Sequence, residues 1–109
     1  MNSQYKKGVL ELCVLALLEK RDCYGYEISE RLCEELSIAD GTVYPILRKL
    51  KADGLVTTYL QEESGGPPRK YYALTAPGRE SFRADCAAYL KFAQAVRNIL
   101  MEEKSDDKE

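Results

Sequence analysis

Four stretches of the chain carry apolar residues at helical spacing, and the stretch between the third and the fourth does not. The first, residues 4–20, is apolar on nearly every side from Val9 to Leu18, where Glu11 is the one charged residue. A helix of that kind has no face suited to water and must be covered on all sides. The pattern therefore predicts a buried N-terminal helix.

The second helical stretch, residues 25–36, has an acidic face and a weaker apolar one. Its predicted inner stripe consists of Tyr26, Ser29, Cys33 and Leu36, and it is widened by Ile28 and Leu32. The face expected in water carries Glu27, Glu30, Glu34 and Glu35. This division predicts an amphipathic helix with one face toward the core.

The third helical stretch lies within "DGTVYPILRKLKADGLV", residues 40–56. Val43, Ile46, Leu47 and Leu50 recur at i, i+3, i+4 and i+7, which predicts one buried face. Gly54 supplies the left-handed residue that commonly ends a helix. Pro45 costs little if the helix starts near Thr42, because first-turn N–H groups have no partner inside the helix.

Residues 55–75, "LVTTYLQEESGGPPRKYYALT", have flanks rich in strand-forming residues around a centre that cannot form regular secondary structure. This pattern predicts a β-hairpin with a stiff tip.

Thr75 can cap a fourth helix that continues to about Glu103. The order is that of a winged helix-turn-helix. We therefore expect a mainly α fold with a small β-hairpin: a winged domain at 1–75, a long helix at 76–104 and an acidic disordered tail at 105–109.

Charge is distributed unevenly along the 109 residues. The formal net charge of −2 argues against a nucleic-acid partner. Residues 8–40, however, hold eight acidic and three basic side chains, whereas residues 41–83 hold seven basic and four acidic ones. The third helix and the hairpin are therefore locally basic, as a surface that meets an anion should be.

In a winged helix-turn-helix the third helix enters the major groove of DNA by its N-terminal end. Its outer side here combines small residues for close approach with hydroxyls and positive charges for phosphates or base edges. The predicted DNA-contacting residues are Gly41, Thr42, Tyr44, Pro45, Arg48 and Lys49, with Arg69 and Lys70 on the hairpin. Taken alone, the helix favours an ordinary solvated face, and Glu62 and Glu63 weaken the case for the hairpin. The combination of both elements favours duplex DNA.

The remaining composition excludes several kinds of site. The chain has no histidine, and its four cysteines match no metal-ligand spacing, so we expect neither a metal nor a cofactor. It also has no phosphate-binding glycine loop and no nucleophile with a base, which argues against an enzyme. Export signals and membrane spans are absent, so we expect a cytoplasmic protein with reduced, structural thiols; a redox sensor is the alternative.

The fourth helix carries a heptad seam. Its members are Phe82, Cys86, Tyr89, Ala93, Val96 and Leu100, spaced 4, 3, 4, 3 and 4 residues apart. Leu90, Phe92 and Ile99 widen the apolar surface beyond what one small domain can cover. The seam predicts a homodimer interface, with purely intramolecular packing as the alternative.

A small effector has no separate domain to bind in this chain. It would bind at the dimer interface or in a crevice beside the DNA-binding unit. The predicted pocket for a small aromatic compound consists of Cys13, Cys86, Tyr89, Phe92 and Ala93, where small residues stand beside large ones. The alternative is that Tyr89 only fills the core.

The segments "YGYEI" (24–28), "GTVYPILRKLKADGLV" (41–56) and "GPPRKYYALTAPG" (66–78), with the long last helix, resemble the PadR family of bacterial transcriptional regulators, in its short subgroup. The resemblance implies a homodimeric repressor whose grip on DNA responds to an effector. It implies that Thr42, Tyr44, Pro45 and Arg48 lie at the DNA and that Arg69 and Lys70 lie on the wing.

The chain departs from that family pattern at one position. Ala39 stands where many relatives place a polar helix cap, so the start of the third helix stays open. Effectors range in this family from phenolic acids to cationic drugs, so the resemblance implies no particular ligand. The alternative function is a winged-helix module that binds another protein and has lost its DNA contacts.

Overall fold

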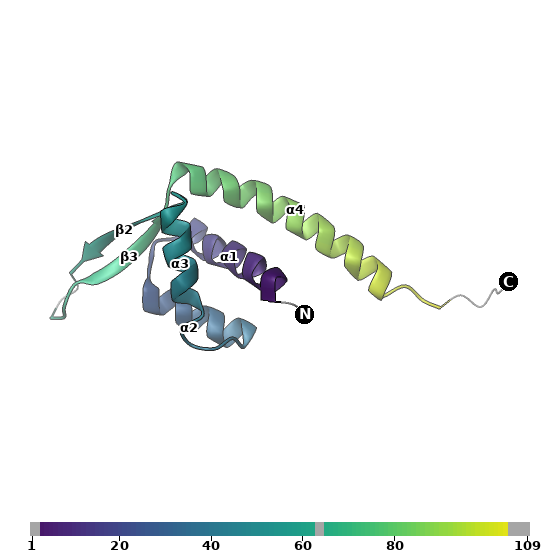
Figure 1. Ribbon diagram of the computed structural model, residues 1–109, viewed down its shortest axis with the longest axis horizontal. Helices are drawn as coiled ribbons and strands as arrows, with labels where there is room; N and C mark the ends of the chain where they lie inside the picture. Colours follow the sequence, from purple (N-terminus) through teal and green to yellow (C-terminus); the bar gives the residue numbers. More distant parts are fainter. Residues whose placement is uncertain (1–2, 63–64, 105–109) are drawn as a thin grey trace.

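The computed structural model describes residues 3–62 and 65–104, with side chains from Gly8 onward. Its elements, in chain order, are α1 (Ser3–Lys20), β1 (Cys23–Tyr24), α2 (Gly25–Leu36), α3 (Val43–Ala52), β2 (Val56–Gln61), β3 (Arg69–Leu74) and α4 (Ala76–Leu100). Figure 1 shows α1, α2 and α3 gathered into one body, from which the hairpin projects on one side and α4 on the other. The predicted acidic tail at 105–109 lies outside the described residues.

The core lies where α1 meets α3. All four apolar residues of the predicted α3 face are at most 4% exposed, so that prediction is confirmed: Val43, Ile46, Leu47 and Leu50. Helix α1 packs against α2, α3, α4 and β3, as its apolar sequence requires. It contributes Leu10, Val14, Leu15 and Leu18 to the core. Its Leu12 and Leu17 are only half-buried, so the predicted covering of this helix on all sides is confirmed for one face of α1 within the single chain.

The predicted inner stripe of α2 was wrong at both ends. Ile28, Ser29 and Leu32 are the buried residues of this helix, whereas the side chains of Tyr26 and Leu36 are 60% and 41% exposed. Tyr26 lies in the first turn, and Leu36 is the last residue before Ser37, whose φ of 55° ends the helix. Both side chains therefore project past the ends of the face that packs on the core.

The start of α3, which the sequence left open, falls at Val43, with Thr42 before it in helical conformation and no side-chain cap bond. Pro45 is then the third residue of the helix, inside the first turn, where its missing N–H costs nothing. Gly54 has a φ of 77°, as predicted for the residue that ends this helix.

The predicted hairpin is confirmed as β2 and β3, paired in antiparallel register from Val56 with Leu74 to Gln61 with Arg69. The sequence did not predict a third strand. β1 pairs with the other edge of β3, Cys23 opposite Tyr72 and Tyr24 opposite Tyr71, which gives the strand order β1–β3–β2. Two residues are too short for any periodicity to be visible.

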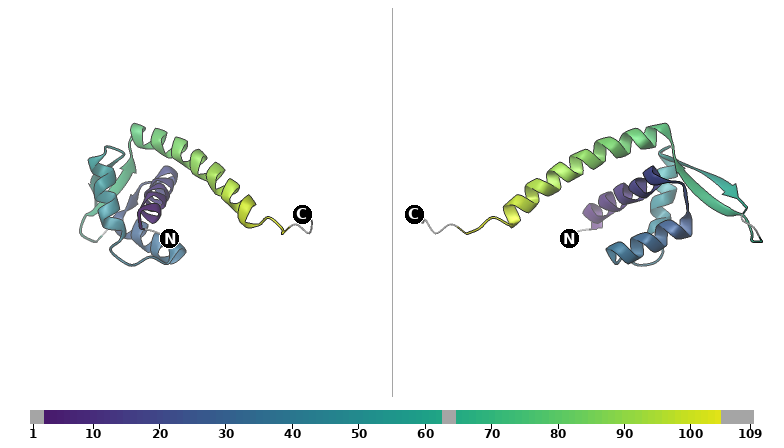
Figure 2. Two further views of the ribbon diagram at one scale, coloured as in Figure 1. Left: turned by 45° about the vertical axis from the view of Figure 1, so that its right-hand side comes forward. Right: turned by 180° about the vertical axis from the view of Figure 1, so that it is seen from behind.

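Helix α4 begins as predicted and ends three residues early. The Thr75 hydroxyl accepts a hydrogen bond from the Gly78 N–H at 3.0 Å and donates to the Gly54 carbonyl at 2.7 Å. An ion pair of 3.1 Å between Arg79 and Glu19 ties the first turns of α4 to the end of α1. Figure 2 shows that α4 then runs on past the body formed by the other helices. None of the described helices has the length and apolar character needed to cross a membrane.

Candidate nucleic-acid interface

A cleft of about 660 Å³ opens between the start of α2, the outer side of α3 and the hairpin. Its lining residues are Tyr24, Gly25, Tyr26, Tyr44, Arg48, Arg69, Lys70 and Tyr72. They bring together four tyrosines and three cationic side chains from three separate segments, and none of these described lining residues is a carboxylate. Such a lining suits an anion that also has apolar surface.

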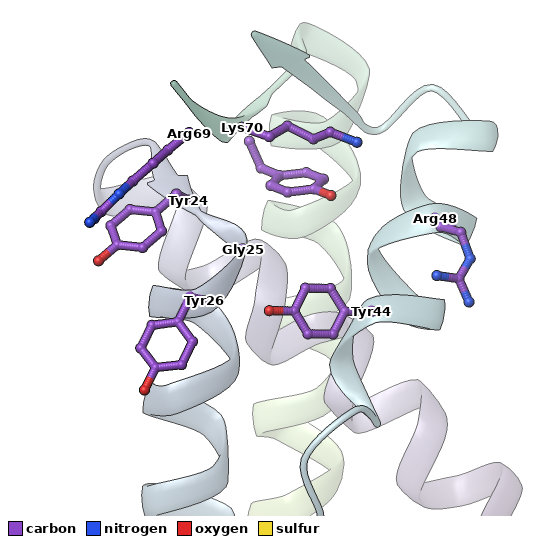
Figure 3. Close-up of a pocket in the computed structure, with 8 residues that line it drawn as sticks. Tyr24, Gly25, Tyr26, Tyr44, Arg48, Arg69 and Lys70 are labelled. Carbon is purple, nitrogen blue, oxygen red and sulfur yellow. The ribbon is translucent and has the colours of Figure 1, made fainter. Parts of the chain in front are cut away.

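Tyr44 and Arg48 reach the cleft from α3, one helical turn apart. Figure 3 shows the Tyr44 ring pointing from α3 toward Gly25, while Arg48 lies farther along the same helix. Gly41 and Pro45 are exposed on this side of α3, as predicted, whereas Thr42 is half-buried. The structure therefore places Tyr44, Pro45 and Arg48 together on one accessible face.

Lys49 does not lie at the cleft. Its ammonium pairs with the Asp53 carboxylate at 3.0 Å and with the Glu11 carboxylate at 3.6 Å. The hydrogen bond from Lys49 to Asp53, and then the negative charge of Glu11, raise the pKa of Lys49 above its usual value. Of the predicted DNA contacts, this one is turned toward α1.

The two cations of the wing, Arg69 and Lys70, lie on opposite faces of β3. Successive strand residues point to opposite sides of a sheet, so Lys70 shares a face with Tyr72, and Arg69 shares one with Tyr71. Figure 3 shows the two side chains leading away from each other. The Arg69 guanidinium carbon lies 4.5 Å from the centre of the Tyr24 ring. Both residues still line the cleft.

Sequence reasoning missed four residues of the cleft: Tyr24, Gly25, Tyr26 and Tyr72. "YGYEI" was noted only for its resemblance, and the Tyr26 ring was placed in the core. Tyr72 forms the inner wall, because its ring is 8% exposed. Burial raises the pKa of its hydroxyl, and the nearby positive charge of Arg48 acts in the opposite direction.

The predicted effector residues lie in different surroundings in the described part of the single chain. A groove of about 370 Å³ lies between α1 and α4, and Tyr89 is the one of the five that lines it. Cys13 packs against the core instead, and the Phe92 side chain is 57% exposed. Cys86 and Ala93 are half-buried.

Three of the four cysteines, Cys13, Cys23 and Cys33, have a raised thiol pKa. Burial raises the pKa of Cys13 and of Cys23 above the usual value. The pKa of Cys33 is also raised, first by burial and then by its hydrogen bond to the Asp40 carboxylate. Redox-sensing cysteines need a lowered pKa, so these directions favour structural thiols.

Three packed helices, a short antiparallel sheet with a projecting hairpin and a cationic cleft beside α3 define a winged helix-turn-helix protein. The family model described as "Transcriptional regulator PadR-like family" matches residues 14–84, so the chain belongs to that family. The family consists of transcriptional regulators, and this chain is accordingly a DNA-binding regulator and not an enzyme.

Individual relatives agree with this assignment. The chain is similar to the crystal structure of a PadR-like transcriptional regulator from Bacillus cereus, with 34% identity, a TM-score of 0.83, and 93% of this chain and 100% of that one covered. A transcriptional regulator from Streptococcus gives 33% identity, a TM-score of 0.81, and coverages of 90% and 98%. The negative transcriptional regulator PadR of Bacillus subtilis is 33% identical over 97 residues, 85% of this chain but only 53% of that protein.

Proposed function

We propose that the chain forms a homodimeric repressor that binds a two-fold symmetric DNA operator and releases it when a small effector binds. The observation that carries this proposal is the cleft beside α3, which joins Tyr44 and Arg48 to the cations of the wing, with no carboxylate among the described residues of its lining. α3 then enters the major groove, and the wing neutralises the adjacent backbone.

The dimer is supported by the apolar surface of α4. This helix has 25 residues, about 38 Å at 1.5 Å per residue, and its second half extends beyond the winged body in Figure 2. The large apolar side chains exposed along this half are Leu90, Phe92, Ile99 and Leu100. An exposed stripe of this kind is typical of a protein–protein interface.

The predicted seam divides into two parts in this account. Phe82 already packs against the core of its own chain, so the partner is expected to meet the later members: Tyr89, Ala93, Val96 and Leu100. Helix α1 of the partner, whose Leu12 and Leu17 are only half-buried, supplies the facing surface. Two-fold pairing would then cover both helices at once.

The direction of regulation is supported by the Bacillus subtilis relative, which is a negative transcriptional regulator. We place the effector beside Tyr89, where the groove between α1 and α4 meets the expected dimer axis. A planar aromatic compound there would change the angle between the two winged units and the spacing of their α3 helices. The protein would act in the cytoplasm, on the chromosome.

The repressor proposal is tested by enrichment of duplexes from a random DNA library with the full-length protein at moderate salt. The expected product is a pseudo-palindrome whose half-sites lie about one or two helical turns apart. Affinity for that duplex should fall steeply as salt rises, because several phosphates are neutralised, whereas an apolar protein interface would be insensitive to salt. Equal affinity for the enriched and a random duplex would refute the proposal.

The effector site needs its own experiment. Planar aromatic compounds are titrated into the wild-type dimer and into Tyr89→Leu while tyrosine fluorescence is recorded. The wild type should bind more tightly, since stacking on an aromatic ring contributes about 1 kcal/mol beyond area burial. Equal affinities in the two proteins would place the effector elsewhere.

A further inference from the structure

Arg69 is held in place by the ring of Tyr24. The guanidinium carbon lies 4.5 Å above the centre of that ring, which is cation–π distance. The two residues are far apart in sequence and meet because β1 pairs with β3, Tyr24 opposite Tyr71. Arg69 stands two residues before Tyr71 and so shares its face of the sheet.

Tyr24 is itself fixed from two directions. Its ring meets Tyr71 edge-on at 5.6 Å and 61°, and Tyr71 stacks on Tyr59 at 5.6 Å and 16°. The row ends at Asp22, whose carboxylate accepts a 2.7 Å hydrogen bond from the Tyr59 hydroxyl. Cross-strand aromatic pairs of this kind stabilise a sheet face, so three strands hold the Tyr24 ring in place.

The backbone of Tyr24 is also held. Its N–H donates to the Glu27 carboxylate at 3.0 Å, and the same carboxylate pairs with Arg21 at 3.0 Å. This contact fixes the residue directly before α2. The Tyr24 ring is therefore a rigid support beside the first turn of that helix.

Stacking engages only the flat face of a guanidinium, whereas its N–H donors point outward from its edge. A free arginine loses about 2 kcal/mol of rotamer entropy when it is fixed. The Tyr24 ring lowers this cost for Arg69 in the complex with DNA. Arg69 lies over Tyr24 at the α2 side of the cleft, and the Lys70 side chain leads away from it on the other face of the hairpin.

We propose that Tyr24 is a positioning residue for DNA binding: it holds Arg69 against a backbone phosphate at the α2 edge of the cleft, while Lys70 binds a different phosphate. This inference rests on the proposed operator binding. The ligand is a phosphodiester of the duplex, recognised by a charge-assisted contact. Adjacent residues of the wing thus serve two positions on the DNA.

A double-mutant cycle tests this positioning with the full-length protein and a duplex enriched from a random library. Tyr24→Leu should weaken binding roughly 3- to 10-fold in the wild-type background, about the net contribution of one ordinary hydrogen bond, because Arg69 keeps its charge and loses only its support. The same change should cost nothing further in Arg69→Gln, because the residue that it positions is gone. In the matched Lys70→Gln background the full loss should remain, since Lys70 lies on the other face.

Conservative variants separate positioning from folding. Tyr24→Phe keeps the ring and should bind within about twofold of wild type, because cation–π attraction does not need the hydroxyl. Arg69→Gln should reduce the slope of log affinity against log salt by about one phosphate contact, and Tyr24→Leu should reduce it in part. Equal losses from Tyr24→Leu in the Arg69→Gln and Lys70→Gln backgrounds would overturn the inference.

A second measurement stands even if Tyr24→Leu does not fold. Single phosphates of the enriched duplex are neutralised one at a time as methylphosphonates. Neutralising either of two separate phosphates should weaken binding by the wild type. Neutralising the first should not weaken binding by Arg69→Gln any further, and neutralising the second should not weaken binding by Lys70→Gln any further. If both variants become insensitive to the same phosphate, the inference fails while operator binding stands. If the wild type enriches no duplex at all, the proposed function fails first.

Discussion

The ring of Tyr44 on α3 lies against Gly25, the first residue of α2. A Cβ at position 25 would lie 3.2 Å from Cε1 of Tyr44 and 3.6 Å from Cε1 of Tyr72. The first of these distances is tighter than ordinary van der Waals contact, so glycine lets the tyrosine ring settle directly on the backbone. The position of Tyr44 in the cleft therefore depends on a residue of another helix.

Gly25→Ala should weaken operator binding while leaving the fold intact. The added methyl pushes the Tyr44 ring by a few tenths of an ångström, and we expect a loss of roughly 3- to 10-fold, comparable with one misplaced hydrogen bond. The temperature of thermal unfolding should change little. The helix preference for alanine over glycine, about 0.5–1 kcal/mol in a helix interior, acts against the cost of displacing the Tyr44 ring. Gly8→Ala is the matched control, since its Cβ meets nothing within 4 Å. Wild-type affinity in Gly25→Ala would contradict this role.

Charging the later part of the α4 seam should break the dimer. Tyr89→Glu and Val96→Glu would each bury an unpaired carboxylate at the proposed interface, a cost of several kcal/mol. Light scattering after size-exclusion chromatography should report monomers, or the proteins should be insoluble. Gln94→Glu changes an exposed position of the same helix and should leave the dimer intact. Stable, folded dimers from both seam variants would refute the interface.

The Tyr59 hydroxyl should lose its proton at a higher pH than an ordinary tyrosine does. Its hydrogen bond to Asp22, followed by burial and the negative charge of that carboxylate, raises the pKa of Tyr59 to about 12. A raised pKa means that the protonated hydroxyl favours the folded state. This contribution is complete below the ordinary pKa of about 10 and is lost as the pH rises toward 12.

Ultraviolet absorbance of the tyrosinate form measures this titration. Asp22→Ala should lower the midpoint of the Tyr59 part of the late component toward the ordinary value. Tyr59→Phe should reduce the late component to the share of Tyr72, whose pKa burial also raises. An unchanged late component in Asp22→Ala would show that the hydrogen bond does not set the pKa of Tyr59.

Periodic features could be predicted from the sequence. The apolar residues of the buried α3 face repeat over two helical turns. The hairpin has strand-forming flanks around a glycine- and proline-rich centre that is typical of a turn. Both elements therefore follow from local sequence. Tyr26 was wrongly predicted to face the core. A tyrosine at helical spacing suits a core and a solvated cleft equally well, and the two locations differ only in the segments that pack around it. The pairing of β1 with β3 rests on two residues and gives no pattern.

The cleft itself is a non-local feature. Its residues come from segments 24–26, 44–48 and 69–72, which the fold alone brings together. The separation of Arg69 from Lys70 follows from strand alternation, but only once the register of Gln61 with Arg69 shows that the strand already includes position 69. Similarly, only the packing of α3 on α1 shows that Lys49 pairs with Glu11 and does not face the cleft.

Titration of the enriched operator with wild type, Tyr44→Ala and Arg48→Ala, followed by fluorescence anisotropy against a random duplex, tests the central claim most directly. Both variants should lose the preference for the operator, since each good side-chain contact to a base is worth about 1–3 kcal/mol, and circular dichroism should show the wild-type fold. Arg69→Ala and Lys70→Ala should instead weaken binding more evenly across sequences and flatten its salt dependence. Lys49→Ala, which removes an ammonium already held by Asp53 and Glu11, is the matched control and should keep the preference. Unchanged preference in Tyr44→Ala and Arg48→Ala would contradict the account.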